Sequence, residues 1–125
     1  MSTLLDWTKA LQNADGDEAL LIELAGVFID ECPEMMRQVR AAIDGRDAQE
    51  LRRTAHSLKG SAHLFAASEA GAAAFRLEEM GADSNFRDVE DGWNLLRFEV
   101  EGLLTELIAH VGNRNSDETQ DRQNS

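Results

Sequence analysis

Hydrophobic residues recur at intervals of three and four along most of the chain, which is the spacing of one face of an amphipathic helix. This pattern predicts a short helix over residues 3–11 and longer helices over residues 18–43, 48–64, 69–80 and 86–110. Pro33 falls inside the second of these segments, where it removes one backbone donor. We expect a kinked helix there, although two separate helices fit the same pattern.

Short polar breaks separate the expected helices, and several of their residues are typical of helix ends. The expected caps are Asp15 or Asp17, Gly45, Asp47, Gly81, and Ser84 or Asn85. Long amphipathic helices joined by short connections pack as antiparallel neighbours. The sequence therefore predicts an all-α fold, an antiparallel up-and-down four-helix bundle preceded by a short N-terminal helix. Residues 1–112 are expected to form this single domain, and residues 113–125, which contain no hydrophobic residue, a disordered tail.

The formal net charge of −12 over 125 residues argues against binding to nucleic acid or to an anionic membrane surface. The single cysteine, Cys32, cannot form an internal disulfide bond, and we interpret it as a small packing residue in a reducing compartment. The first residues lack the basic segment of a signal peptide, and no apolar stretch approaches the roughly 20 residues of a membrane-spanning helix. These features favour a cytoplasmic protein.

The segment TAHSLKGSAHLF at residues 54–65 combines a hydrophobic face with an unusual outer strip. At roughly 100° per residue, His56 lies about 140° from the centre of the hydrophobic face. That face consists of Leu51, Ala55, Leu58, Ala62 and Phe65, and the outer strip of Arg52, His56, Lys59, Gly60 and His63. A glycine inside a helix costs about 1 kcal/mol relative to alanine, and helix formation gives no reason for Gly60. Such departures from local rules are expected at functional sites.

The residue types on this strip fit the acceptance of a phosphoryl group. An exposed neutral imidazole is a nucleophile near neutral pH. Lys59, one turn after His56, can neutralise a phosphoryl group bound to the imidazole, and Gly60 leaves room for another protein to approach. The alternative is that His56, Lys59 and Gly60 are ordinary surface residues of a helix.

Antiparallel packing around a turn near Ala67 would place Glu78 opposite His56. A carboxylate in this position can hold one imidazole nitrogen and leave the other free to attack. Alternatively, Glu78 forms an exposed acidic pair with Glu79. A metal-dependent hydrolase that uses His56 and His63 is disfavoured, because these residues are not spaced as an i, i+4 pair and the sequence has no HExxH motif.

The stretch AHSLKGSA at residues 55–62 resembles the core motif of histidine phosphotransfer (HPt) domains of two-component phosphorelays. The resemblance covers, in order and spacing, nearly the whole chain before the polar tail. It includes Asp6-Trp7, Gly16-Asp17, Phe28, Pro33 and Leu77-Glu78. Small residues depart from the family pattern at two places, since Ala66-Ala67 stands where Gly-Ala is common and Ala74 where cysteine is frequent.

The resemblance implies a bundle in which His56 is phosphorylated, Lys59 steadies the phosphoryl group and Glu78 hydrogen-bonds near the imidazole. It implies further that Gly60 and Ser61 keep the surface open. The implied function is that of a phosphorelay intermediate, which accepts a phosphoryl group on His56 from the phospho-aspartate of a receiver domain and passes it to an aspartate of another receiver. The expected partners are response-regulator receiver domains, with a sensor or hybrid histidine kinase upstream, and the protein is expected to be a monomer.

Basic side chains gather on the two helices that would face a receiver, although the chain as a whole is acidic. Arg52, Arg53 and His63 are candidates for docking contacts with an acidic receiver pocket, together with Gly60 and Ser61. The strip has no carboxylate cluster, so Mg²⁺ is expected in the receiver and no cofactor in this chain. The sequence has no glycine-rich phosphate loop, so no kinase activity is expected. Two alternatives stay open: a domain phosphorylated directly by a chemotaxis-type histidine kinase, and a receiver-binding module that transfers nothing.

Overall fold

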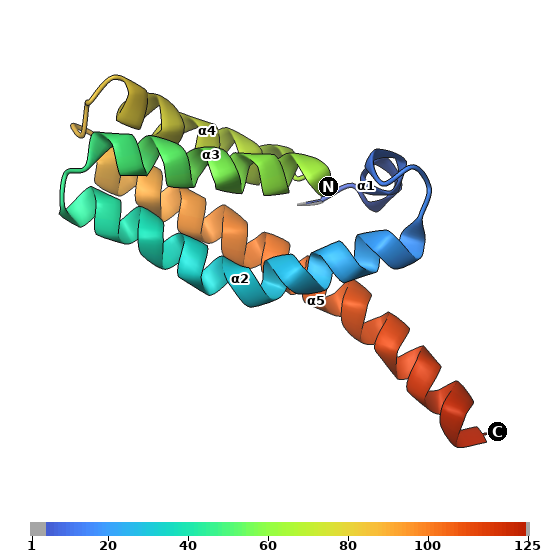
Figure 1. Cartoon of the computed structure of the whole chain (residues 1–125). Coiled ribbons are helices and arrows are strands. Elements are labelled where there is room, and N and C mark those ends of the chain that lie inside the picture. Colours follow the sequence, from blue (N-terminus) through green and yellow to red (C-terminus); the bar gives the residue numbers. More distant parts are fainter. Residues whose placement is uncertain (1–4, 125) are drawn as a thin grey trace.

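The structure, a computed structural model, describes residues 5–124 and the side chains of residues 5–112. Its elements are the helices α1 (Trp7–Asn13), α2 (Glu18–Asp44), α3 (Ala48–Leu64), α4 (Ser68–Ala82) and α5 (Val89–Asn124). Helices α2 to α5 lie side by side as a bundle, and α1 lies at the end of the bundle near the turn between α3 and α4 (Figure 1). The predicted all-α bundle with a short N-terminal helix is confirmed.

The structure bears on two further expectations, the lack of a membrane-spanning helix and the disordered C-terminal tail. None of the helices in the described residues has the apolar length required to cross a bilayer. Helix α5 continues to Asn124, past residue 110 where the sequence predicts its end, and so covers most of the predicted tail, residues 113–125. The side chains of this part lie outside the described residues, and the disorder of the tail stays a prediction.

Aspartate side chains cap the first three helices. The carboxylate of Asp6 accepts a hydrogen bond from the backbone nitrogen of Lys9 at 3.1 Å, which starts α1. Asp17 caps α2 and Asp47 caps α3 in the same way. Of the two candidates for the cap of α2, Asp17 is therefore the right one, and Asp15 lies in the preceding turn with a φ of 54°. Each cap satisfies a backbone donor that the first helical turn leaves without a partner.

Pro33 lies inside α2, which continues through it as one helix of 27 residues. The helix bends about midway along its length (Figure 1). A proline lacks the backbone donor for one helical hydrogen bond, and its ring crowds the preceding turn, so a bend is the expected response. The kinked helix is thus the correct one of the two sequence interpretations.

The predictions for the C-terminal end of α4 and for the start of α5 were wrong. Gly81 lies inside α4, whose C-cap is Asp83, and it faces α3. A Cβ atom on residue 81 would lie 2.6 Å from the backbone nitrogen of Arg52 and 2.7 Å from the carbonyl oxygen of Ala48. The glycine is therefore required by the close approach of two helices rather than by a helix end. Helix α5 begins at Val89, so Ser84 and Asn85 lie in the turn before it.

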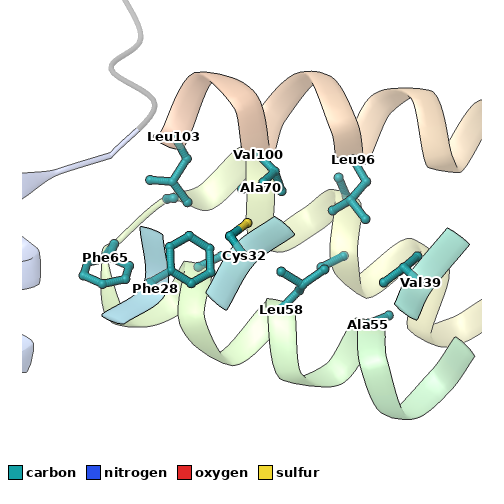
Figure 2. Packing of buried hydrophobic residues seen from close by; sticks show 14 of the residues in the cluster. Phe28, Cys32, Val39, Ala55, Leu58, Phe65, Ala70, Leu96, Val100 and Leu103 are labelled. Carbon is teal, nitrogen blue, oxygen red and sulfur yellow. The ribbon is translucent and has the colours of Figure 1, made fainter. Parts of the chain in front are cut away.

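Side chains from all four long helices meet in one hydrophobic core, which contains Cys32 (Figure 2). Phe28 of α2 and Phe65, at the end of α3, pack with their ring centroids 5.7 Å apart. Burial raises the pKa of the Cys32 thiol to about 11, so that it stays protonated and unreactive. This agrees with the interpretation of Cys32 as a packing residue.

The turn between α3 and α4 is tied to the N-terminal helix. The side-chain amide of Asn13 donates hydrogen bonds to the carbonyl oxygens of His63 at 3.1 Å and Leu64 at 3.0 Å, at the end of α3. The backbone nitrogen of Asp6 donates to the carbonyl oxygen of Ala66, which has a left-handed φ of 53°. Ala66 stands where the pattern that the sequence resembles commonly has glycine, which adopts this left-handed conformation more readily than alanine. These contacts fix the turn after which α4 runs back along α3.

We predict that Gly81→Ala lowers the free energy of unfolding by about 1–3 kcal/mol, because the added methyl group would overlap the backbone of α3. Gly26→Ala, in α2, is the matched control. A Cβ atom on residue 26 would meet nothing within 4 Å, so this variant is expected to gain up to about 1 kcal/mol of stability. Urea denaturation of the two variants measures the difference. Equal stabilities would contradict the close approach at Gly81.

Candidate functional site

The site lies where α3 and α4 run side by side. His56 and Lys59 project from successive turns of α3, and Glu78 reaches across from α4. The side chain of His56 is 66% exposed, whereas those of Lys59 and Glu78 are 20% and 14% exposed. The exposed imidazole therefore lies next to a lysine–glutamate ion pair that is largely buried.

The carboxylate of Glu78 divides its two oxygen atoms between two partners. Its Oε2 lies 3.0 Å from Nδ1 of His56, and its Oε1 lies 2.7 Å from Nζ of Lys59. This is the placement that antiparallel packing predicts for residue 78, and it rules out the alternative of an exposed acidic pair with Glu79 as the main contact of Glu78. One carboxylate thus fixes both the orientation of the imidazole and the position of the ammonium group.

Glu78 is ionised near neutral pH. Burial on its own raises the pKa of its carboxyl group, but hydrogen bonds and charge from Lys59 and His56 outweigh burial and lower this pKa below its usual value. An ionised carboxylate only accepts hydrogen bonds, so Nδ1 of His56 must donate the hydrogen bond between them. The neutral imidazole then carries its proton on Nδ1 and its lone pair on Nε2. The nucleophilic nitrogen is the one that Glu78 does not hold.

Gly60 and Ser61 line a groove between α2 and α3, hereafter the α2–α3 groove. Its other lining residues are Leu24, Val27, Phe28, Glu31, Met35, Ser57, Leu64 and Phe65. A Cβ atom on residue 60 would meet no heavy atom within 4 Å, so the bundle itself gives no reason for this glycine. The groove is largely apolar, and two of its lining residues, Ser57 and Gly60, are neighbours of His56 on α3.

The other predicted docking residues, Arg52, Arg53 and His63, do not all lie near His56. Arg52 is exposed on α3 one turn before it. Arg53 forms an ion pair with Glu50 at 2.7 Å and lines a second groove, near the turn between α2 and α3. His63 is exposed and packs against Gly71 of α4, where a Cβ atom would lie 2.9 Å from Cδ2 of the imidazole. Arg52 and His63 are therefore exposed on the same helix as His56, one turn before it and two turns after it, and His63 shares a groove with Lys59, whereas Arg53 is engaged elsewhere.

Sequence reasoning missed Phe75, which lies one turn before Glu78 on α4. Its ring centroid is 5.0 Å from Nζ of Lys59, which is a cation–π distance, and the residue is 45% exposed. The only sequence signal is its spacing, because residues 75 and 78 share a helix face. That spacing becomes informative only when Glu78 is known to face Lys59.

Fold and site together define a helical bundle that presents a surface histidine backed by a lysine and a carboxylate. The family model "Hpt domain" matches residues 23–113, and the chain belongs to this family. It therefore has a phosphotransfer role in two-component signalling, where Hpt domains work with histidine kinases and receiver domains.

Two solved structures show the same fold. The histidine-containing phosphotransfer protein B (HptB) from Pseudomonas aeruginosa PAO1 is similar with a TM-score of 0.82 and 22% sequence identity, over 90% of this chain and 98% of that one. The HPT domain of a sensor hybrid histidine kinase from Shewanella is similar with a TM-score of 0.73 and 21% identity, over 92% of this chain and 96% of that one. No curated protein sequence matches.

The contact between His56 and Glu78 predicts the imidazole tautomer. In ¹⁵N NMR spectra at neutral pH, the neutral form of His56 is expected to carry its proton on Nδ1. In Glu78→Ala the acceptor is lost, so both tautomers should appear at His56. The chain has three histidines, and His63 and His110 serve as internal controls that should not change. A wild-type His56 protonated mainly on Nε2 would contradict the geometry.

Proposed function

We propose that the chain is a phosphorelay intermediate that accepts a phosphoryl group on His56 from the phospho-aspartate of a receiver domain and passes it to an aspartate of another receiver. The observation that carries this proposal is the exposed imidazole whose Nδ1 is held by Glu78, the same carboxylate that holds Lys59. The arrangement leaves one nucleophilic nitrogen facing outward and a cation beside it.

The transfer step needs no proton from this chain. The lone pair on Nε2 of His56 attacks phosphorus, the new N–P bond forms, and the P–O bond to the donor aspartate breaks and leaves a carboxylate. The imidazole keeps its Nδ1 proton and becomes positively charged, and the Glu78 carboxylate stabilises that charge. Lys59 offsets the charge of the phosphoryl group. Attack by the aspartate of a second receiver reverses these bond changes.

The α2–α3 groove supports docking by a receiver. It offers apolar side chains such as Leu24, Val27 and Met35 in the same groove as Gly60, which lies one turn after His56 and has no side chain to obstruct a partner. Arg52, on the same surface, suits the acidic pocket of a receiver. In this proposal the protein acts as a monomer in the cytoplasm, binds no cofactor of its own, and meets Mg²⁺ only in the receiver's pocket.

The proposal is tested by mixing the protein with receiver domains of the same organism that carry a labelled phospho-aspartate. We expect acid-labile, base-stable label on the wild type and none on His56→Gln. His63→Gln is the matched control and should be labelled. Chasing the labelled protein with an unlabelled second receiver should remove the label. A wild type that stays unlabelled by every receiver and binds one nonetheless would be a receiver-binding module, and label from a kinase alone would indicate direct phosphorylation.

A further variant, at Gly60, distinguishes an effect on receiver docking from an effect on the stability of the fold. Gly60→Ala should raise the free energy of unfolding by about 1 kcal/mol, because alanine favours the helix and has space here. The same methyl group would obstruct the docked receiver, so the transfer rate should fall by about tenfold. Gly26→Ala should gain similar stability and keep the wild-type transfer rate. Unimpaired transfer by Gly60→Ala would exclude close contact of the receiver at this residue.

A further inference from the structure

Phe75 is a large aromatic side chain that the hydrophobic core does not explain. It is 45% exposed, and it lies on a helix whose other positions are mostly small or charged. Its ring lies 5.0 Å from Nζ of Lys59 and lines the groove between α3 and α4 together with Lys59, His63, Ser68, Gly71 and Ala72. The contact with the ammonium group is the specific interaction that this ring makes.

Lys59 is held from two sides. Its ammonium group lies 2.7 Å from Oε1 of Glu78 and under the face of the Phe75 ring. A lysine side chain on a helix surface normally samples many rotamers, so two simultaneous contacts restrict it strongly. The cation–π attraction is stronger for a partly desolvated cation, and the Lys59 side chain is largely buried.

Phosphorylation of His56 changes the balance of charge around Lys59. A phosphoryl group bound to the imidazole brings negative charge towards the carboxylate of Glu78, and the ammonium group of Lys59, together with the positive charge on the imidazole, offsets the repulsion. An ammonium group has three donors, so it can retain Glu78 while it donates to the phosphoryl group. The ring of Phe75 attracts the cation without competing for either acceptor.

We infer that Phe75 is a positioning residue for phosphotransfer, whose ring holds the ammonium group of Lys59 beside Glu78 and His56. The inference rests on the proposed function, and it adds a residue that acts through Lys59. Because the contact of the ring with the site is the one with the ammonium group of Lys59, its effect on transfer is expected to depend on Lys59.

The contact itself is measured without any phosphotransfer. The chain has two lysines, Lys9 and Lys59, so selective lysine labelling gives two sets of side-chain NMR signals. Protons close to the face of an aromatic ring shift upfield, so the ε-protons of Lys59 should move downfield in Phe75→Leu, whereas those of Lys9 should not change. Lys59 signals that are the same in both proteins would overturn the inference.

The effect on transfer is measured with the labelled receiver. Phe75→Leu should slow transfer to His56 by about two- to fivefold, whereas Phe75→Trp, which keeps a π-face, should retain the wild-type rate. Phe98→Leu, at a residue that is 69% exposed on α5, is the matched control and should have no effect. In a Lys59→Ala background, Phe75→Leu should cause no further loss.

The outcomes distinguish a positioning role of Phe75 from a docking role, and both from a failure of the proposed function. A wild-type rate in Phe75→Leu, or an equal loss in the Lys59→Ala background, would overturn the positioning role, and the second result would make Phe75 a docking contact. A wild type that accepts no label would instead overturn the proposed function, and with it the role of Phe75. The shift of the Lys59 signals would still report whether the ring and the ammonium group are in contact.

Discussion

Helices α3 and α4 approach so closely that backbone atoms of α3 would touch a side chain at Gly81, and the site depends on this approach. A carboxylate on α4 reaches two side chains on α3 only when the helix axes are near each other. Small buried residues along α4 permit this spacing: Ala70, Gly71, Ala73, Ala74 and Gly81. The turn at Ala66, tied to α1 through Asn13, sets the register in which Glu78 meets His56.

The shared carboxylate couples two properties that could otherwise vary independently. One oxygen of Glu78 sets the imidazole tautomer, and the other holds the ammonium group. Partial burial strengthens both contacts, because solvent screens them less. The two donors in turn outweigh the effect of burial and keep the carboxyl group ionised. The three groups therefore maintain one another in the charge states that nucleophilic attack by His56 requires.

Local patterns predicted most of the fold and part of the site. Hydrophobic spacing and the aspartate caps located α2 and α3 to within a residue, since both are properties of single helices. Gly81 was misassigned because a close approach between helices is set by tertiary contacts. The start of α5 was misassigned because Ser84, with its left-handed φ, and Asn85 donate backbone hydrogen bonds back to Gly81 and Met80 and so belong to the end of α4. Within the site, the spacing of His56 and Lys59 is local, and antiparallel register located Glu78. The role of Phe75 depends on where the Lys59 side chain points, which spacing does not reveal.

Two helical glycines illustrate how fold and function separate in this chain. Gly60 and Gly81 carry the same intrinsic helix penalty. At Gly81 the neighbouring backbone explains the absence of a side chain, whereas at Gly60 nothing lies within 4 Å of a Cβ position. Gly60 weakens its helix and avoids no steric overlap inside the bundle, so the reason for a glycine at this position must come from outside the bundle. Since Gly60 lies one helical turn after His56, that reason is best sought in a partner that must come close to the imidazole.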